Sequence, residues 1–444
     1  MSDRRILRGD LLDFTEDPGF AAPDQAQGVR YRPDHQILIE AGRIAAVLPA
    51  DAALPAEWQG GAVCDYRGQL ILPGFIDTHV HAPQIDVIAS YGTELLDWLN
   101  TYTFPAERRY ADPAVSYDGA RRFLNALWAH GTTSAVVFAT VHKISAQALF
   151  ETAAHQRMRL ITGKVLMDRH APDGLRDDVN QAERDCIELI DQWHGKDRQA
   201  FAVTVRFAPT SSPEQLQMAG RLCQRRGDIY MQTHVAESRA EVQWVAELFP
   251  TARSYLDVYD RVGLIGPRAV LAHGIWLDDH DRALLRDSGA QIAHSPSSNL
   301  FLGSGLFDWA TAQRDGVKVS LGSDVGGGTS LCLLRNMADA YKIQALQGTR
   351  LTAWKALYTA TAGAASHLGL ADEMGRIEPG CLADLAVWQW AVGPVALHRD
   401  TLAQRVLHER LFAWMTLADE RNLISTWIAG RPVYRAPFDE ALAA

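Results

Sequence analysis

The stretch PGFIDTHVHAPQ (residues 73–84) decides how the rest of the chain is interpreted. The largely apolar run over 69–81 predicts a β-strand that ends in His79 and His81. Residues i and i+2 of a strand point to the same side of the sheet, so the two imidazoles can chelate one metal ion. A chain with 15 histidines contains about half of one such His-x-His pair by chance, so the pair needs support from the rest of the sequence.

Downstream of this stretch, short apolar runs alternate with longer helical stretches. Alternating strand and helix units predict a parallel sheet, and eight of them predict an α/β fold of the (β/α)8 TIM barrel type over residues 69–374. The helical stretches include 116–131, 212–227 and 277–289, and the second of them opens with Ser212 and Pro213, a good N-cap and first helical residue. The strands are expected at 69–81, 132–140, 159–167, 202–209, 229–236, 269–274, 290–296 and 317–324.

The two ends of the chain have a different character. Residues 35–49 form two apolar runs around the turn signal Ala41-Gly42, which predicts a hairpin. Residues 375–390 and 424–435 also contain strand-like runs with Gly and Pro turns. We therefore expect residues 1–68 and 375–444 to form one small β-sandwich domain together.

Polar residues gather at the predicted strand ends. Catalytic residues of a (β/α)8 barrel lie at the carboxyl ends of its strands. The pair Arg206-Phe207 ends the fourth predicted strand. The same rim of the barrel would hold five histidines and one aspartate, namely His79, His81, His234, His273, His294 and Asp324.

Four of these side chains match the ligand set of a catalytic zinc site. Three histidines and one carboxylate (His79, His81, His234 and Asp324) leave a position open for water. Zinc lowers the pKa of such a water to about 7, which makes a nucleophile available at neutral pH. Iron or manganese suits the same ligands, and His234 and Asp324 could instead be a structural residue and a turn residue.

The remaining rim residues are assigned by their spacing. Glu237 follows His234 by three residues and is expected to shuttle protons without binding the metal. His273 could be a further ligand, a hydrogen-bond donor to the attacking oxygen, or a structural residue, and we favour the donor. His294 could support its neighbours on the rim or simply fill the core.

The composition excludes several classes of function. The formal net charge is −10 and there is no Lys/Arg block, which argues against nucleic acid as a partner. No apolar run reaches the roughly 18 residues that span a bilayer, and the first residues lack the apolar segment of a signal peptide. The five cysteines are scattered without a CxxC pair, which indicates a reducing compartment. We therefore expect a cytoplasmic protein that acts on a small neutral molecule, with neither nucleic acid nor membrane as a partner.

Several motifs resemble those of a known family. HVAE (234–237), LAHG (271–274) and LGSD (321–324) follow the first motif in the order found in the amidohydrolase superfamily. Within that superfamily, the chain is similar to guanine deaminases over nearly its whole length. The segments that carry this closer similarity are HAPQ (81–84), YGTELLDWLNTYTFPAERRY (91–110), HGTTSAVVFATVH (130–142), GKVLMDRHAPD (163–173), RFAPTSSPEQ (206–215) and SNLFLGSGLF (298–307).

The resemblance implies a zinc-dependent hydrolase that converts guanine and water to xanthine and ammonia, with one zinc per chain. It also implies a homodimer. The zinc ligands fall on the four residues named above, the catalytic groups on Glu237, Asp324 and His273, and guanine recognition on Gln84, Arg206 and Phe207, with His234 also at the substrate. The alternative is a related amidohydrolase acting on a modified purine such as 8-oxoguanine, on a pterin or on a triazine.

The sequence departs from the family in two places. His294 stands where family members often have cysteine, and Val235-Ala236 occupies a variable stretch before Glu237. Neither departure affects a ligand, but both could alter the pocket and its preference among purines. Segment 91–110 and the run Gly326-Gly327-Gly328 follow the first and last barrel strands, so both are expected over the mouth of the barrel, where segment 91–110 closes on substrate or instead serves a structural or subunit-interface role.

Overall fold

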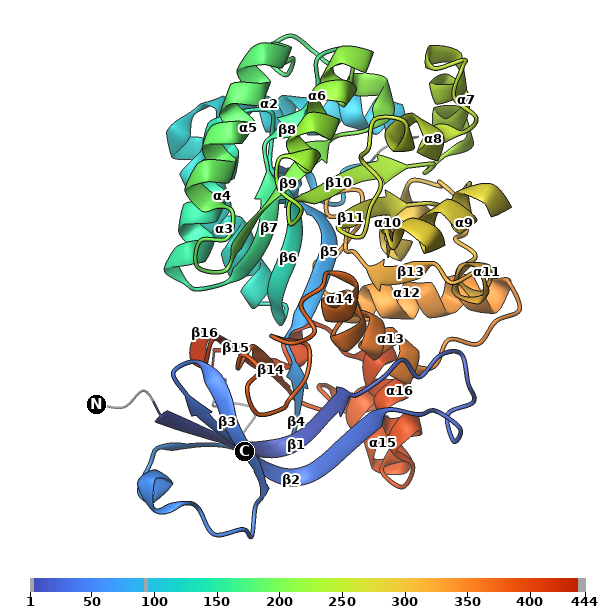
Figure 1. Cartoon of the computed structure of the whole chain (residues 1–444). Helices are drawn as coiled ribbons and strands as arrows, with labels where there is room; N and C mark the ends of the chain where they lie inside the picture. The colour runs from blue at the N-terminus through green and yellow to red at the C-terminus, as the bar shows by residue number, and fades with distance from the viewer. Residues whose placement is uncertain (1–3, 92–94, 438–444) are drawn as a thin grey trace. The chain divides into compact units, whose positions relative to one another are not determined.

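The computed structural model describes residues 4–91 and 95–437, and its contacts divide the chain into two compact units (Figure 1). The first unit comprises Met1–Ile76, Asn125–Thr133 and Thr352–Ala444. The second comprises Asp77–Leu124 and Ser134–Leu351. Compared with the expected ranges 1–68 and 375–444, the first unit therefore also includes residues 69–76, 125–133 and 352–374.

A parallel sheet builds the barrel, as the sequence predicts. The strand order along it is β5, β6, β7, β9, β10, β11, β12 and β13, and β8 pairs with β9 beside this path. The strands from β6 onward pair in parallel with their neighbours. Their bounds are β5 Phe75–His81, β6 Thr132–Phe138, β7 Arg159–Gly163, β8 Val165–Leu166, β9 Gln199–Val205, β10 Tyr230–Val235, β11 Ala269–His273, β12 Gln291–His294 and β13 Lys318–Leu321.

Two of the expected strands are wrong in detail. The run 69–81 is two strands, because β4 (Val63–Pro73) pairs with strands of the terminal sheet before β5 starts the barrel. The division falls at Gly74, where a Cβ would stand 2.2 Å from the Thr133 side chain. The run 159–167 is likewise divided into β7 and β8, and a Cβ on Gly163 would stand 2.0 Å from the carbonyl oxygen of Ala202.

Helices follow the barrel strands in sequence. The predicted N-cap of α6 is confirmed, since the Ser212 hydroxyl accepts from the Gln215 amide and Pro213 is the first helical residue. Before α3, a π-helix over Leu99–Thr103 separates α1 from α2. The helices of this region are α1 Leu95–Trp98, α2 Phe104–Arg108, α3 Pro113–Trp128, α4 Lys143–His155, α5 Val179–Trp193, α6 Pro213–Gln224, α7 Arg239–Leu248, α8 Tyr255–Asp260, α9 Asp279–Ser288, α10 Pro296–Phe301, α11 Trp309–Arg314 and α12 Leu333–Leu346.

The terminal segments build a separate seven-stranded sheet. Its order is β16, β15, β14, β4, β1, β2 and β3, and every pair except β1 with β4 is antiparallel. The predicted hairpin is β2 and β3, and Ala41 and Gly42 turn it with φ values of 52° and 83°. The strands are β1 Arg4–Phe14, β2 Val29–Glu40, β3 Arg43–Pro49, β14 Leu385–Trp388, β15 Leu423–Ile428 and β16 Arg431–Arg435, and the helices of this unit are α13 Ala353–Thr359, α14 Ala362–His367, α15 Pro394–Ala403 and α16 Leu407–Leu417.

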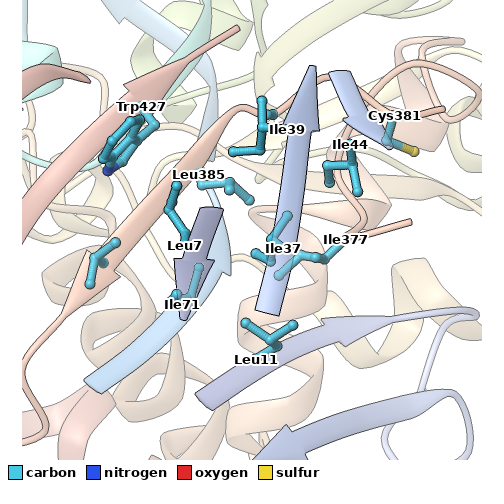
Figure 2. Packing of buried hydrophobic residues seen from close by; sticks show 12 residues of the cluster. Leu7, Leu11, Ile37, Ile39, Ile44, Ile71, Ile377, Cys381, Leu385 and Trp427 are labelled. Atoms are coloured by element: carbon cyan, nitrogen blue, oxygen red, sulfur yellow. The ribbon is translucent and has the colours of Figure 1, made fainter. Parts of the chain in front are cut away.

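Both faces of this sheet bury apolar side chains. Figure 2 shows Leu7, Ile37, Leu385 and Trp427 together in one cluster drawn from both ends of the chain. Ile6 precedes Leu7 and lies in a second cluster with Leu38 and Trp58, because successive residues of a strand face opposite sides of the sheet. The first cluster joins residues from both ends of the chain, which explains why the two termini fold together.

The barrel closes where the end of β13 meets β5. The Asp324 amide donates to the His79 carbonyl at 2.9 Å, and the His81 amide donates to the Val325 carbonyl at 3.0 Å. Gly322 makes this approach possible, because a Cβ there would stand 2.8 Å from the His79 Cβ and 3.0 Å from its carbonyl oxygen. This contact between β5 and the segment after β13, called the seam below, therefore places the predicted ligands His79 and His81 beside Asp324.

Gly322→Ala tests this close approach. Overpacking of a tight contact costs about 1–3 kcal/mol, so we expect a lower midpoint of thermal unfolding and less bound metal than in the native chain. Gly227→Ala is the matched control, because a Cβ at Gly227 meets no atom within 4 Å. Equal unfolding midpoints and equal metal contents for the two variants would contradict the steric role of Gly322.

Candidate active site

The four predicted ligands meet at the carboxyl end of the barrel. Their ligand atoms all lie within 4.8 Å of one another, a spacing that could hold a metal ion. His79 and His81 come from the end of β5, His234 from β10, and Asp324 from the turn after β13. The Asp324 Oδ1 atom lies 3.0 Å from His79 Nε2 and 3.4 Å from His81 Nε2.

The donor set fits a cation at this point. The Nε2 atoms of His81 and His234 face each other at 3.1 Å. Nδ1 of His234 lies 2.5 Å from the Arg206 carbonyl oxygen, which can only accept a hydrogen bond, so this nitrogen carries the proton and Nε2 keeps its lone pair. Burial lowers the pKa of His81 to about 3 and the pKa of His234 well below its usual range, so both rings are neutral. A lone pair on His234 Nε2 that points at a second imidazole nitrogen, beside a carboxylate, is an arrangement that a bound divalent metal satisfies.

Asp324 is held in an unusual backbone conformation. Its φ is 50°, in the left-handed region that few residues other than glycine adopt. Burial raises the pKa of its carboxyl, but the adjacent His79 and His81 outweigh that effect and bring the pKa well below its usual range. The group is therefore an anion that can serve as a ligand. Its second oxygen, Oδ2, lies 3.6 Å from His273 Nε2.

Glu237 lines the same pocket as the ligand cluster. Its Oε1 accepts from the Ser304 hydroxyl at 2.8 Å, and its Oε2 lies 3.5 Å from His273 Nε2. Burial, and then the Asp324 carboxylate, raise the pKa of Glu237 to about 8. A carboxyl whose pKa is near neutrality can take up and release a proton during a reaction.

The two remaining rim histidines differ in their surroundings. His273 has a φ of 71°, its Nδ1 lies 2.8 Å from the Asn299 side-chain oxygen, and its Nε2 faces both carboxylates of the site. His294 is fully buried against the Phe307 ring at a centroid distance of 4.8 Å. Within the described residues, His294 is outside the ligand cluster and outside the lining of the pocket.

A pocket opens over the ligand cluster and is lined by His81, His234 and Asp324 among others. The predicted recognition residues Gln84, Arg206 and Phe207 all line it, and each is at most 6% exposed. Gln84 follows β5, and Arg206 and Phe207 follow β9. The structure thus gathers every residue predicted for metal, proton transfer and substrate at one end of the barrel.

Sequence reasoning missed several residues of this site. Trp98, Leu99 and Leu302 line the pocket, and so does Glu241, whose carboxylate accepts from the Glu237 amide at 2.9 Å. Glu107 in α2 is fully buried and contacts both Gln84 and Arg206. The side-chain oxygen of Asn299 lies within hydrogen-bonding distance of His273 Nδ1. Glu107 and Asn299 lie in segments singled out above, 91–110 and 298–307, but nothing in their spacing assigned them a role.

Comparison with known proteins agrees with this arrangement. The model of the amidohydrolase family matches residues 70–433. The guanine deaminase of Escherichia coli (strain K12) is 42% identical over 440 residues, which cover 97% of this chain and 98% of that protein. Its solved structure superposes with a TM-score of 0.94 at 41% identity and covers 98% of this chain and 100% of that one.

A second solved structure is informative because it contains a ligand. The guanine deaminase from C. acetobutylicum, with guanine bound in its active site, superposes with a TM-score of 0.86 at 28% identity and covers 97% of this chain and 100% of that one. Both the family model and the full-length relatives cover the barrel with all of the residues described above. The chain therefore belongs to the amidohydrolase family, and within that family it is similar along its whole length to guanine deaminases.

Proposed function

We propose that this chain is a guanine deaminase, which hydrolyses guanine to xanthine and ammonia. The observation that carries the proposal is a full-length relative of that activity at 42% identity, combined with a pocket that joins a metal-ligand cluster to buried polar groups suited to a purine. Hydrolysis is also the chemistry of the family to which the chain belongs.

We propose one zinc ion per chain, held by His79, His81, His234 and Asp324. The imidazole nitrogens suit zinc, and the carboxylate is a ligand that zinc also accepts. When bound, zinc acts as a Lewis acid that lowers the pKa of a bound water and so supplies a nucleophile at neutral pH. The fixed tautomer of His234 supports this assignment.

Guanine would bind with its C2 toward the ligand cluster and its N1 and O6 edge toward Gln84 and Arg206. These side chains are buried, so an imperfect ligand leaves them without partners, which is costly. Phe207 would pack against the purine ring from the end of β9, and its own ring contacts the Trp244 ring at a centroid distance of 6.0 Å. His234 lines the same pocket and lies at the substrate as well as in the ligand cluster.

Proton transfers would be carried by three residues around the reacting carbon. The water oxygen forms a bond to C2, Asp324 accepts a proton from the water, and Glu237 delivers a proton to ring N3. His273 faces both carboxylates and would hold the attacking oxygen by a hydrogen bond. The amino group then receives the proton held by Asp324, the bond from C2 to the amino nitrogen breaks and ammonia leaves, and the C2 hydroxyl returns its proton to Glu237 as xanthine forms.

We further propose that the protein acts in the cytoplasm as a dimer of two identical subunits, as expected from the sequence. The scattered cysteines and the acidic composition support a reducing compartment and a small substrate. Within residues 4–91 and 95–437, no helix is both long and apolar enough to cross a membrane.

The substrate assignment is tested by ammonia release from the zinc-loaded protein. We expect release from guanine, with xanthine as the other product, well above release from adenine, 8-oxoguanine and cytosine. The physical reason in the case of adenine, which lacks the 6-oxo group, is that it leaves buried polar groups of the pocket unpaired. The base 8-oxoguanine keeps the N1 and O6 edge of guanine and tests the fit of the pocket around C8. Ammonia release from only one of the other bases would identify that base as the substrate instead of guanine. Release from none of the four bases would refute the proposed deamination.

Glu237→Gln tests the proton shuttle. The amide keeps the size of the side chain but cannot accept and return a proton, so we expect kcat to fall by about 10²–10⁴-fold with little change in KM. Metal content, measured in parallel, should stay at one ion per chain. Glu247→Gln, an exposed residue of α7, is the control and should leave kcat unchanged. Near-native turnover of Glu237→Gln with metal bound would remove Glu237 from the mechanism.

His81→Ala tests the metal site. Removal of one of four ligands should lower both metal content and activity sharply, and added zinc should restore neither fully, because the coordination shell remains incomplete. His155→Ala, an exposed position at the end of α4, is the control. Elemental analysis of the two purified variants is the measurement, and a full complement of metal in His81→Ala would place the ion elsewhere.

A further inference from the structure

A buried carboxylate that the proposed reaction does not use lies beside the two recognition residues. Glu107 of α2 is fully buried, and both of its oxygens accept from Arg206 Nη1, at 2.9 and 2.8 Å. Its Oε1 also accepts from Gln84 Nε2 at 3.2 Å. One carboxylate from the segment after β5 therefore contacts both side chains that would face the purine.

The orientation of the Gln84 amide is fixed from both sides. Its Nε2 donates to Glu107, and its Oε1 accepts from the Gly326 amide at 3.2 Å. A carboxylate can only accept and a backbone amide can only donate, so a flipped Gln84 would meet an acceptor with its oxygen and a donor with its nitrogen. The amide therefore offers a ligand one remaining N–H donor and one remaining oxygen lone pair, and the positions of the two cannot be exchanged.

The Arg206 guanidinium is fixed by the same helix. Glu107 occupies its Nη1, and the Phe104 ring lies under the guanidinium carbon at 5.2 Å from the ring centroid. The ion pair compensates a charge that would be costly to bury alone. Since both contacts to the carboxylate use Nη1, the Nη2 group is left to donate to a ligand in the pocket that Arg206 lines.

We propose that Glu107 is a positioning residue that makes the site select a 6-oxo purine over a 6-amino purine, an inference that rests on the proposed function. The edge of guanine presents an N1–H donor next to the O6 acceptor, which matches an amide fixed as acceptor and donor, with an arginine donor beside it. A 6-amino purine presents an N1 acceptor next to an amino donor. It would fit only if the Gln84 amide were flipped, which Glu107 opposes.

The test compares two purines with the same 2-amino leaving group, guanine and 2,6-diaminopurine. In the zinc-loaded native enzyme we expect kcat/KM for C2 deamination to favour guanine by about 100-fold or more, because buried polar groups reject the mismatched edge. In Glu107→Gln, kcat/KM for guanine should fall mainly through KM, and the guanine to 2,6-diaminopurine ratio should fall by about tenfold or more. Product analysis distinguishes deamination at C2, which yields isoguanine, from deamination at C6, which yields guanine.

Two further variants separate positioning from general damage. Glu107→Asp keeps a group that can only accept, so its substrate ratio should lie between those of the native enzyme and Glu107→Gln. If Glu107→Gln does not fold, the ratio in Glu107→Asp decides and must still lie below the native value. Glu247→Gln, the exposed control, should keep the native ratio, and metal content and unfolding midpoint are measured for every variant.

The outcomes distinguish the inference from the proposed function. No ammonia from guanine with the native enzyme would refute the proposed function and the inference together. Native turnover of guanine, with an unchanged substrate ratio in the folded Glu107 variants, would refute only the role of Glu107, even if both rates fell, because an equal loss on both purines is what a purely structural role predicts.

Discussion

The contact between β5 and the segment after β13 is the constraint on which the site depends. Two backbone hydrogen bonds across this seam place Asp324 beside His79 and His81, and Gly322 leaves room for the approach. His234 then completes the ligand cluster from β10, several strands away along the sheet. A barrel achieves this because the carboxyl ends of all its strands meet at one rim, so residues distant in sequence become neighbours.

Buried charge is the second organising feature, and each charge has a specific partner. Asp324 faces three histidines, and the Glu107 carboxylate faces the Arg206 guanidinium. Glu237 and Glu241 are exceptions, because burial together with a neighbouring carboxylate raises their pKa values, to about 8 and about 7. The carboxyl groups that line the pocket thus differ, because Asp324 is an anion whereas Glu237 has a pKa near neutrality, and the difference arises from their surroundings.

Much of this arrangement could be predicted from the sequence, for identifiable reasons. The His-x-His pair, His234, His273 and Asp324 each end a short apolar run, and parallel strands bring such ends together. The division of 69–81 into β4 and β5 falls at Pro73-Gly74, a pair that marks turns, but the pairing of β4 with the terminal sheet involves strands that are distant in sequence. The roles of Glu107 and Asn299 were hidden for the same reason. A glutamate in a helical segment and an asparagine after a serine run resemble surface residues until the fold buries them beside Arg206 and His273.

The most direct test of the account is a crystal structure of the zinc-loaded Glu237→Gln variant with guanine. The account predicts one metal ion within about 2.0–2.2 Å of imidazole nitrogens of His79, His81 and His234 and of an Asp324 oxygen. It also predicts that C2 of guanine faces the metal and that the N1 and O6 edge faces Gln84 and Arg206. A metal bound to other residues, or a purine turned so that C6 faces the metal, would contradict it.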